Sequence, residues 1–102
     1  MNDFIVNNNE IYKLDKENKK IAYAKIPPFN ESAINILSVV VDPSLRGQGL
    51  AGKLMEFTYN YLKDNNKKAV LTCPYAIYWF NKNPIKKDVL LDENLNIEAC
   101  VI

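Results

Sequence analysis

One loop of the chain holds all of its glycines and its single arginine. Arg46, Gly47, Gly49 and Gly52 lie within seven residues, whereas the other twelve cationic side chains are lysines. Glycines allow backbone N–H groups to turn towards an anion, and the start of a helix adds partial positive charge. The loop therefore predicts a phosphate-binding site, with a plain glycine-rich turn as the alternative.

Two well-known phosphate-binding motifs match part of the sequence of this loop. Gly47-x-Gly49-x-x-Gly52 fits the dinucleotide fingerprint, but that motif follows the first strand of a βαβ unit, and here three extended runs come first. Gly47-x-x-x-x-Gly52-Lys53 fits a P-loop until Leu54 takes the place of the magnesium-binding hydroxyl. Neither context suits the loop.

The elements that must position this loop follow from hydrophobic periodicity. Alternating or apolar runs predict four main strands, over residues 10–15, 20–26, 33–41 and 68–73. Two prolines at 27–28 are expected to end the second strand. Leu50, Leu54, Phe57 and Tyr61 recur at helical spacing and predict a helix of about four turns that ends at residues 64–66.

The last third of the chain carries fewer signals of secondary structure. Residues 75–82 read as a short second helix that stops at Asn83-Pro84. Residues 89–102 are expected to form either a final strand or a loose tail. Short connections make the first three strands an antiparallel meander, and the helical crossover makes the third and fourth strands parallel neighbours. We expect a single α+β domain over residues 1–102, with a mixed, mostly antiparallel sheet and two helices.

The amino-acid composition excludes several classes of active site and disfavours several kinds of partner. The chain has no histidine and only two cysteines, Cys73 and Cys100, which excludes histidine-based triads and Cys₂His₂ or Cys₄ zinc sites. We expect no metal. A formal net charge of +1 argues against nucleic acid as the main partner. No apolar run has membrane-spanning length and the N-terminus does not read as a signal peptide, so a cytoplasmic protein without a membrane partner is expected.

The loop and its surroundings also resemble a known family. Arg46-x-x-Gly49-x-Ala51 resembles the pyrophosphate motif of the GNAT (N-acetyltransferase) superfamily. Cys73-Pro74 at the end of the next strand, with Asn83-Pro84 after it, is similar to a subfamily of very small, single-domain GNAT-like acetyltransferases. The resemblance covers roughly residues 20–89. It implies a parallel strand pair that splays at the cofactor site, acetyl-CoA as cosubstrate, and an amine as acceptor.

The resemblance also implies which residues bind the cosubstrate. Pantetheine would pair with the backbone of the strand before the loop, which is Val39, Val40 and Val41 here. The pyrophosphate would lie on the backbone of the loop, which comprises Arg46, Gly47, Gln48, Gly49, Leu50, Ala51 and Gly52.

The chain departs from the small subfamily at the positions where catalytic groups are expected. Where the small subfamily often has His-Thr-Glu-Val, this chain has Ser38-Val39-Val40-Val41, so the usual His and Glu are absent. A CoA-binding module without transferase activity is therefore the alternative, followed by a domain that keeps the fold only. Cys73 is a candidate nucleophile or acid–base group, or a small packing residue. Tyr75 is a candidate donor to the departing thiolate, and Asp42 is either a base or a capping residue.

Overall fold

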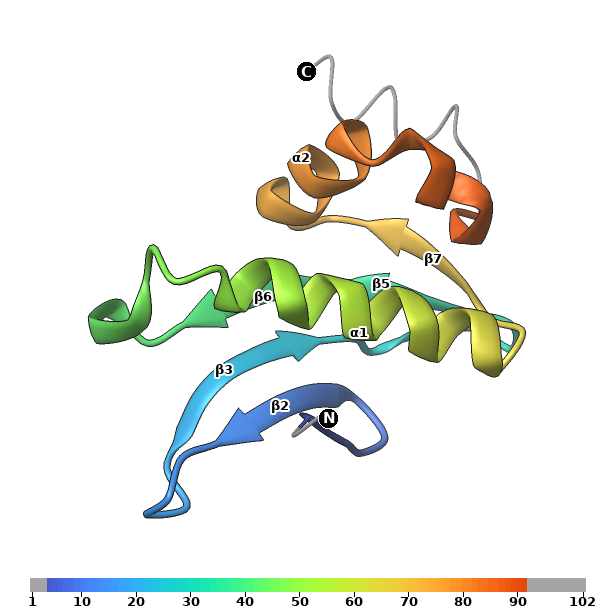
Figure 1. Ribbon diagram of the computed structural model, residues 1–102. Helices are drawn as coiled ribbons and strands as arrows, with labels where there is room; N and C mark the ends of the chain where they lie inside the picture. Colours follow the sequence, from blue (N-terminus) through green and yellow to red (C-terminus); the bar gives the residue numbers. More distant parts are fainter. Residues whose placement is uncertain (1–3, 92–102) are drawn as a thin grey trace.

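The described part of the chain forms two small β-sheets (Figure 1). The computed structural model describes residues 4–91. The first sheet is antiparallel throughout and runs in the order β1 (Phe4–Val6), β2 (Glu10–Leu14), β3 (Lys20–Lys25) and β6 (Ser38–Val41). The second runs in the order β4 (Pro28–Asn30), β5 (Ala33–Ile36) and β7 (Lys68–Leu71).

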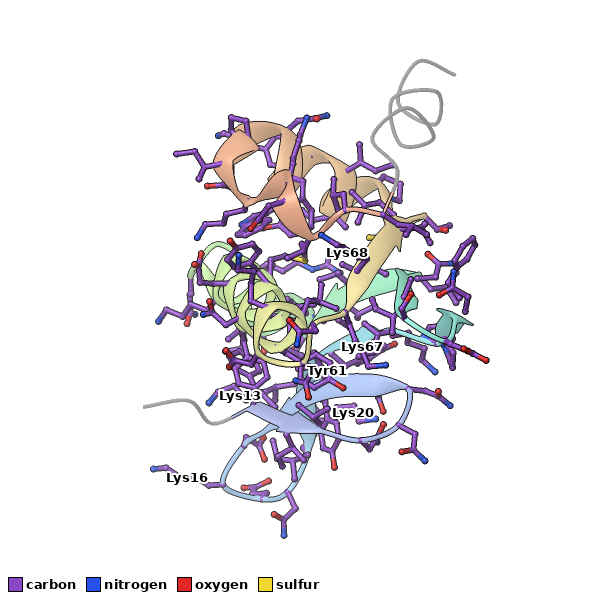
Figure 2. The ribbon with its side chains drawn as sticks, turned by 90° about the vertical axis from the view of Figure 1, so that its right-hand side faces the viewer. Lys13, Lys16, Lys20, Tyr61, Lys67 and Lys68 are labelled. Atoms are coloured by element: carbon purple, nitrogen blue, oxygen red, sulfur yellow. The ribbon has the colours of Figure 1, made fainter. Side chains whose placement is uncertain are left out.

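Two α-helices pack on these sheets. They are α1 (Leu50–Asp64) and α2 (Pro74–Lys82), and two 3₁₀ segments, η1 (Pro43–Leu45) and η2 (Pro84–Val89), precede α1 and follow α2. Helix α1 contacts β2, β3, β6 and β7, whereas α2 contacts β6 and β7. Seen nearly along its axis, α1 lies between the β2–β3 hairpin on one side and β7 with α2 on the other (Figure 2).

The predicted fold class is confirmed, including the parallel pair. Strand β5 pairs in parallel with β7, from Ala33 opposite Lys68 to Ile36 opposite Leu71. The backbone N–H groups of Thr72 and Cys73 both donate to Ile36 O, at 3.1 and 3.0 Å. The two strands part beyond this point, because the chain after Ile36 joins the first sheet while the chain after Leu71 turns into α2.

The prediction of one unbroken strand over residues 33–41 is wrong. Leu37 interrupts it, so that β5 belongs to the second sheet and β6 to the first. Lys25 pairs with Ser38, and its carbonyl also accepts the Leu37 N–H at 2.9 Å, which leaves one extra residue in the strand. Because both halves are apolar, hydrophobic periodicity gives no sign of the change of partner.

The second strand ends ahead of the proline pair, as predicted, but a further strand that was not predicted begins at Pro28. Strand β3 ends at Lys25, but Pro28–Asn30 then forms a short strand at the edge of the second sheet. An edge position tolerates Pro28, since its missing N–H leaves no ladder bond unmade. Residues 4–6 also form a strand that their sequence did not predict.

The buried face of α1 is shifted from the predicted stripe. Leu54, Met55, Thr58 and Leu62 are fully buried, whereas Leu50, Phe57 and Tyr61 are half-buried at its flanks. Thr58 is accommodated inside because its hydroxyl donates to Leu54 O at 2.8 Å. Polar threonine is easily read as surface, so the stripe drawn from apolar residues alone is displaced.

The end of the described chain is only partly ordered into regular structure. Val89 closes η2, and Leu90 makes an isolated parallel bridge with Ala69. Residues 92–102, where a final strand or tail is expected, lie outside the described residues, as does Cys100. Between residues 4 and 91, no helix combines the length and apolarity needed to cross a membrane.

Candidate functional site

The turn from β6 into α1 depends on two glycines in a left-handed conformation. Gly47 has φ +85° and Gly49 has φ +78°. Side chains with a Cβ rarely adopt these values, so the backbone itself selects glycine at both positions. A Cβ at either position would meet no atom within 4 Å. The requirement is therefore conformational and not one of space.

The first turn of α1 presents unpaired backbone donors. Gly49 is the N-cap and has no side chain to cap with, and the first turn has no acidic residue. The first intrahelical bond runs from Lys53 N to Gly49 O at 3.1 Å, so the N–H groups of the three residues in between have no partner within the helix. Such an end attracts an anion through both its donors and the helix dipole.

Gly52 lies in this first turn but differs from the other two glycines. It has ordinary helical geometry, and a Cβ there would meet nothing within 4 Å. Neither conformation nor crowding in the protein requires glycine at this position. The open space over the turn is what a ligand lying on the helix start needs.

A pocket of about 220 Å³ lies over the loop and the helix start. It is lined by Val41, Leu45, Arg46, Gly47, Gly49, Leu50, Ala51, Gly52 and Tyr75. Seven of these nine were predicted as cofactor-binding residues from the sequence and one, Tyr75, as catalytic. Among the predicted site residues, Val39, Val40, Gln48 and Cys73 do not line it.

Leu45 is the lining residue that the sequence analysis missed. It ends η1 and is half-buried. It is the only large apolar residue between Pro43 and Gly49, and that isolation in a polar loop was the available signal. Its side chain gives the pocket an apolar wall beside the glycines.

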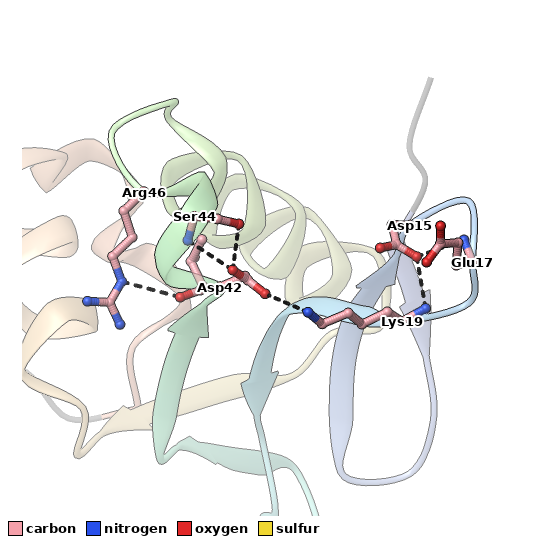
Figure 3. Close-up of polar contacts among 7 residues, drawn as sticks. Asp15, Glu17, Lys19, Asp42, Ser44 and Arg46 are labelled. Atoms are coloured by element: carbon pink, nitrogen blue, oxygen red, sulfur yellow. Dashed lines mark hydrogen bonds and ion pairs between the residues drawn. The ribbon is translucent and has the colours of Figure 1, made fainter.

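Arg46 ties the loop to the end of β6. Its Nε donates to Val41 O at 3.3 Å, as Figure 3 shows. Among residues 4–91 no contact engages its terminal Nη atoms, which remain available to an anion in the pocket. The lone arginine thus holds its guanidinium at the pocket by a backbone contact.

Among residues 4–91 no strand pairs with the edge of β6 that faces away from β3. β6 is the last strand of its sheet, and Asp42 N donates towards β3, to Ile21 O at 2.8 Å. Because successive peptide groups alternate in direction, those of Val40 face β3 and those of Val39 and Val41 face the open edge. Val41 O, which accepts from Arg46, fits this assignment.

Asp42 acts as a cap in the structure. Its carboxylate accepts hydrogen bonds from Ser44 N at 2.9 Å and Ser44 Oγ at 2.7 Å, and it lies 3.4 Å from Lys19 Nζ (Figure 3). The bonds from Ser44, helped by Lys19, lower the pKa of Asp42 below its ordinary value. A carboxylate so stabilised in its ionised form is a poor proton acceptor.

Tyr75 is the titratable phenol at the pocket. Burial is the main cause that raises the pKa of Tyr75, with smaller contributions in the same direction from Tyr78 and Cys73. Lys82 acts in the opposite direction. The hydroxyl of Tyr75 therefore stays protonated at neutral pH, in the form that can donate a hydrogen bond or a proton.

Cys73 lies where the two parallel strands part. It is the N-cap of α2, and its thiol is free and buried, with 6 % of the residue exposed. A cysteine at this position is explained equally by its packing as a small buried residue and by a chemical role. In the part of the chain that the structure describes, no group of three or more His, Cys, Asp or Glu is arranged to hold a metal ion.

Comparison with known proteins identifies the family. The model of the GCN5-related N-acetyl-transferases matches residues 10–89, which is most of the chain. The chain therefore belongs to this family of GCN5-related N-acetyltransferases. Among curated proteins, no sequence matches it.

One solved structure supports the fold. A GCN5-like protein from Staphylococcus aureus, solved by NMR in solution, has 28 % identity to this chain with a TM-score of 0.70, and the match covers 86 % of each chain. A tetramutant of the BH1408 protein from Bacillus halodurans is 22 % identical over 61 % of this chain and 46 % of its own, with a TM-score of 0.47, which is too low to support an argument.

Proposed function

We propose that the protein is an acetyl-CoA-dependent N-acetyltransferase that transfers an acetyl group to an amine. The observation that supports this most directly is the pocket over the start of α1, where two left-handed glycines and an uncapped first turn present unpaired N–H groups beside Arg46. Membership of the N-acetyltransferase family supports the same cosubstrate.

The pyrophosphate, the pantetheine and the thioester of acetyl-CoA would each meet a different part of the fold. The pyrophosphate would accept hydrogen bonds from the amides of the loop and the helix start, with Arg46 beside it. The amide groups of pantetheine would pair with the open peptide groups of Val39 and Val41. The thioester would then lie towards the point where β5 and β7 part, near Leu37 and Cys73.

The transfer needs few groups from the protein. The neutral nitrogen of the acceptor attacks the thioester carbonyl carbon, the C–N bond forms, and the C–S bond breaks with the electron pair leaving on sulfur. Tyr75, which stays protonated, would give its proton to the thiolate and regain one from solvent. Once the C–N bond has formed, the nitrogen carries one proton in excess, which goes to water, because no described side chain that lines the pocket is placed as a base.

A CoA-binding module without transferase activity is the second candidate. Ser38 and Val40 stand where related small acetyltransferases often have His and Glu, and Asp42 is already used as a cap. Both candidates predict binding of acetyl-CoA. They differ only in turnover.

Binding is tested first, by calorimetric titration with acetyl-CoA and with NAD and Mg-ATP as controls. Gly52→Leu should fill the open space over the helix start without backbone strain, so it should abolish binding while the protein stays folded. The double variant Arg46→Glu, Gly49→Trp should also lose binding. Failure of the unmodified protein to bind acetyl-CoA would refute both candidates.

Turnover is tested by release of free CoA thiol in the presence of peptide and small-molecule amines. Tyr75→Phe should lower kcat and leave KM for acetyl-CoA nearly unchanged, because the phenol acts only when the thiolate leaves. If Cys73→Ser leaves the rates unchanged, Cys73 has no part in the mechanism. Binding without release of CoA for any amine would favour the binding module.

A further inference from the structure

A second and larger cavity lies at the opposite end of α1. Its volume is about 400 Å³, and Tyr61 on its wall stands eleven residues along the helix from Leu50, about 17 Å along the axis. It is lined by Val6, Asn7, Asn8, Ile26, Pro28, Asn30, Ala33, Ile34, Tyr61 and Lys67. Figure 2 looks onto this end of the molecule, where Tyr61 and Lys67 lie side by side.

Two asparagines on the wall have their amides oriented by the protein. Asn7 Oδ1 accepts the Asn9 N–H at 3.0 Å. Asn30 Oδ1 accepts from Ser32 N at 2.9 Å and from Ser32 Oγ at 3.3 Å. With both oxygens used, the polar group left on each side chain is its Nδ2, which is a donor.

Lys67 and Tyr61 add further donors to the wall, and the amide of Asn8 offers both a donor and an acceptor. Lys67 Nζ and the Tyr61 hydroxyl have no hydrogen-bond or ion-pair partner among residues 4–91. Among residues 4–91 no aspartate or glutamate lines the cavity. The described wall therefore combines one cation with amide and hydroxyl donors and has no carboxylate to balance the cation.

The nearby C-terminus of α1 does not repel an anion as an open helix end would. Tyr61 O accepts from both Asn65 N and Asn65 Nδ2, at 3.1 and 2.8 Å. Leu62 O accepts from Lys67 N at 2.9 Å, and Lys63 O accepts from Asn66 N at 3.2 Å. These carbonyls of the last turn are thus satisfied within the chain.

We propose that this cavity binds a small monocarboxylate with a short aliphatic chain. The single cation, Lys67, matches one negative charge, and the asparagine and tyrosine donors match the lone pairs of a carboxylate. The floor consists of buried Ile26, Ala33 and Ile34, which would receive the hydrocarbon part. The volume lies in the range of small-molecule sites. This site is separate from the acetyl-CoA pocket and does not depend on it.

The test titrates the full ¹⁵N-labelled chain with sodium hexanoate and, in parallel, with hexanamide. Hexanoate should shift the side-chain NH₂ signals of Asn7 and Asn30 and the backbone signals around Lys67, with saturation. Hexanamide, which keeps the chain but lacks the charge, should cause little change. Absence of shifts at these residues, or equal shifts with the two compounds, would overturn the proposal.

Matched variants isolate the role of the cation. Lys67→Gln should weaken hexanoate binding about tenfold, as expected for the loss of one charge-assisted contact, whereas Lys16→Gln removes the same charge from an exposed turn and should have no effect. Both variants should bind acetyl-CoA like the unmodified protein. An equal effect of the two substitutions would show a general charge effect and contradict a built site.

Discussion

Gly49 and Gly52 lie three residues apart but serve different purposes. Gly49 is required by its backbone angle, φ +78°, which a residue with a Cβ adopts only at a cost. Gly52 has helical angles and free space around it, so alanine would fit the protein there. We attribute the glycine at 52 to the ligand that the pocket is proposed to hold.

Alanine substitutions separate these two roles. Gly49→Ala should destabilise the protein by about 1–2 kcal/mol, because it places a Cβ in the left-handed region. Gly52→Ala should raise stability by up to about 1 kcal/mol, because alanine favours the helix, and should weaken acetyl-CoA binding. Urea unfolding and calorimetry on both variants measure this. Tighter acetyl-CoA binding by Gly52→Ala would contradict the assignment of this space to the ligand.

The protonation states of two side chains near the site have consequences for the proposed reaction. Tyr75 is held protonated by its raised pKa, and Asp42 is held ionised by Ser44 and Lys19. In the proposed mechanism Tyr75 supplies the acid, whereas the carboxylate of Asp42 is engaged as a cap. That mechanism requires the acceptor amine as the free base, so the pKa of the amine should govern the rate.

The pH profile of kcat/KM tests this directly. The rate should rise about tenfold per pH unit until the amine is neutral, which places the plateau near pH 8 for a peptide α-amine and above pH 10 for a lysine side chain. Tyr75 should not limit the profile below pH 10, since a raised pKa keeps it protonated over that range. A plateau at the same lower pH for both acceptors would reveal a base on the protein.

At the scale of elements, the sequence predicts the loop better than the sheet. The glycine loop, α1, α2 and the parallel pair follow from local signals such as Gly47, Gly49 and the Asn83-Pro84 stop. The break at Leu37 does not, because a bulge depends on how Lys25 of another strand pairs with it. The same holds for Tyr75 and Leu45, which meet at one pocket only through the fold.

The displaced buried face of α1 leads to a stability prediction. Met55 was outside the apolar stripe expected from the sequence, yet it is fully buried. Met55→Ala should cost about 2–5 kcal/mol through lost burial and the cavity left behind. Leu50→Ala, at a half-buried flank, should cost less. Urea midpoints of the two variants give the comparison, and a larger loss for Leu50→Ala would contradict the observed packing.

At the scale of the whole molecule, the proposed cosubstrate would touch four elements at once. The pocket is formed by the end of β6, Leu45 of η1, the start of α1 and Tyr75 of α2. Ligand that binds only the folded state stabilises it by about 2.7 kcal/mol at a concentration of 100 Kd. For a domain of this size that corresponds to a rise in Tm on the order of 10 °C or more.

Thermal unfolding with and without acetyl-CoA measures this rise. The double variant Arg46→Glu, Gly49→Trp should show no rise at the same concentration, and Lys67→Gln should show the full rise. An unchanged Tm for the unmodified protein at saturating acetyl-CoA would contradict the proposed site. A rise that persists in the double variant would place the ligand elsewhere.

The open edge of β6 affects how readily the protein associates with other chains. An unpaired strand edge is the usual place where a second chain adds itself and starts aggregation. Here the edge is only four residues long, its valines are half-buried or buried, and α2 packs against the same strand. A short edge beside a helix offers an added strand few backbone partners, whereas the proposed pantetheine arm needs only two or three. The feature that would admit the cosubstrate is therefore also one that disfavours strand addition.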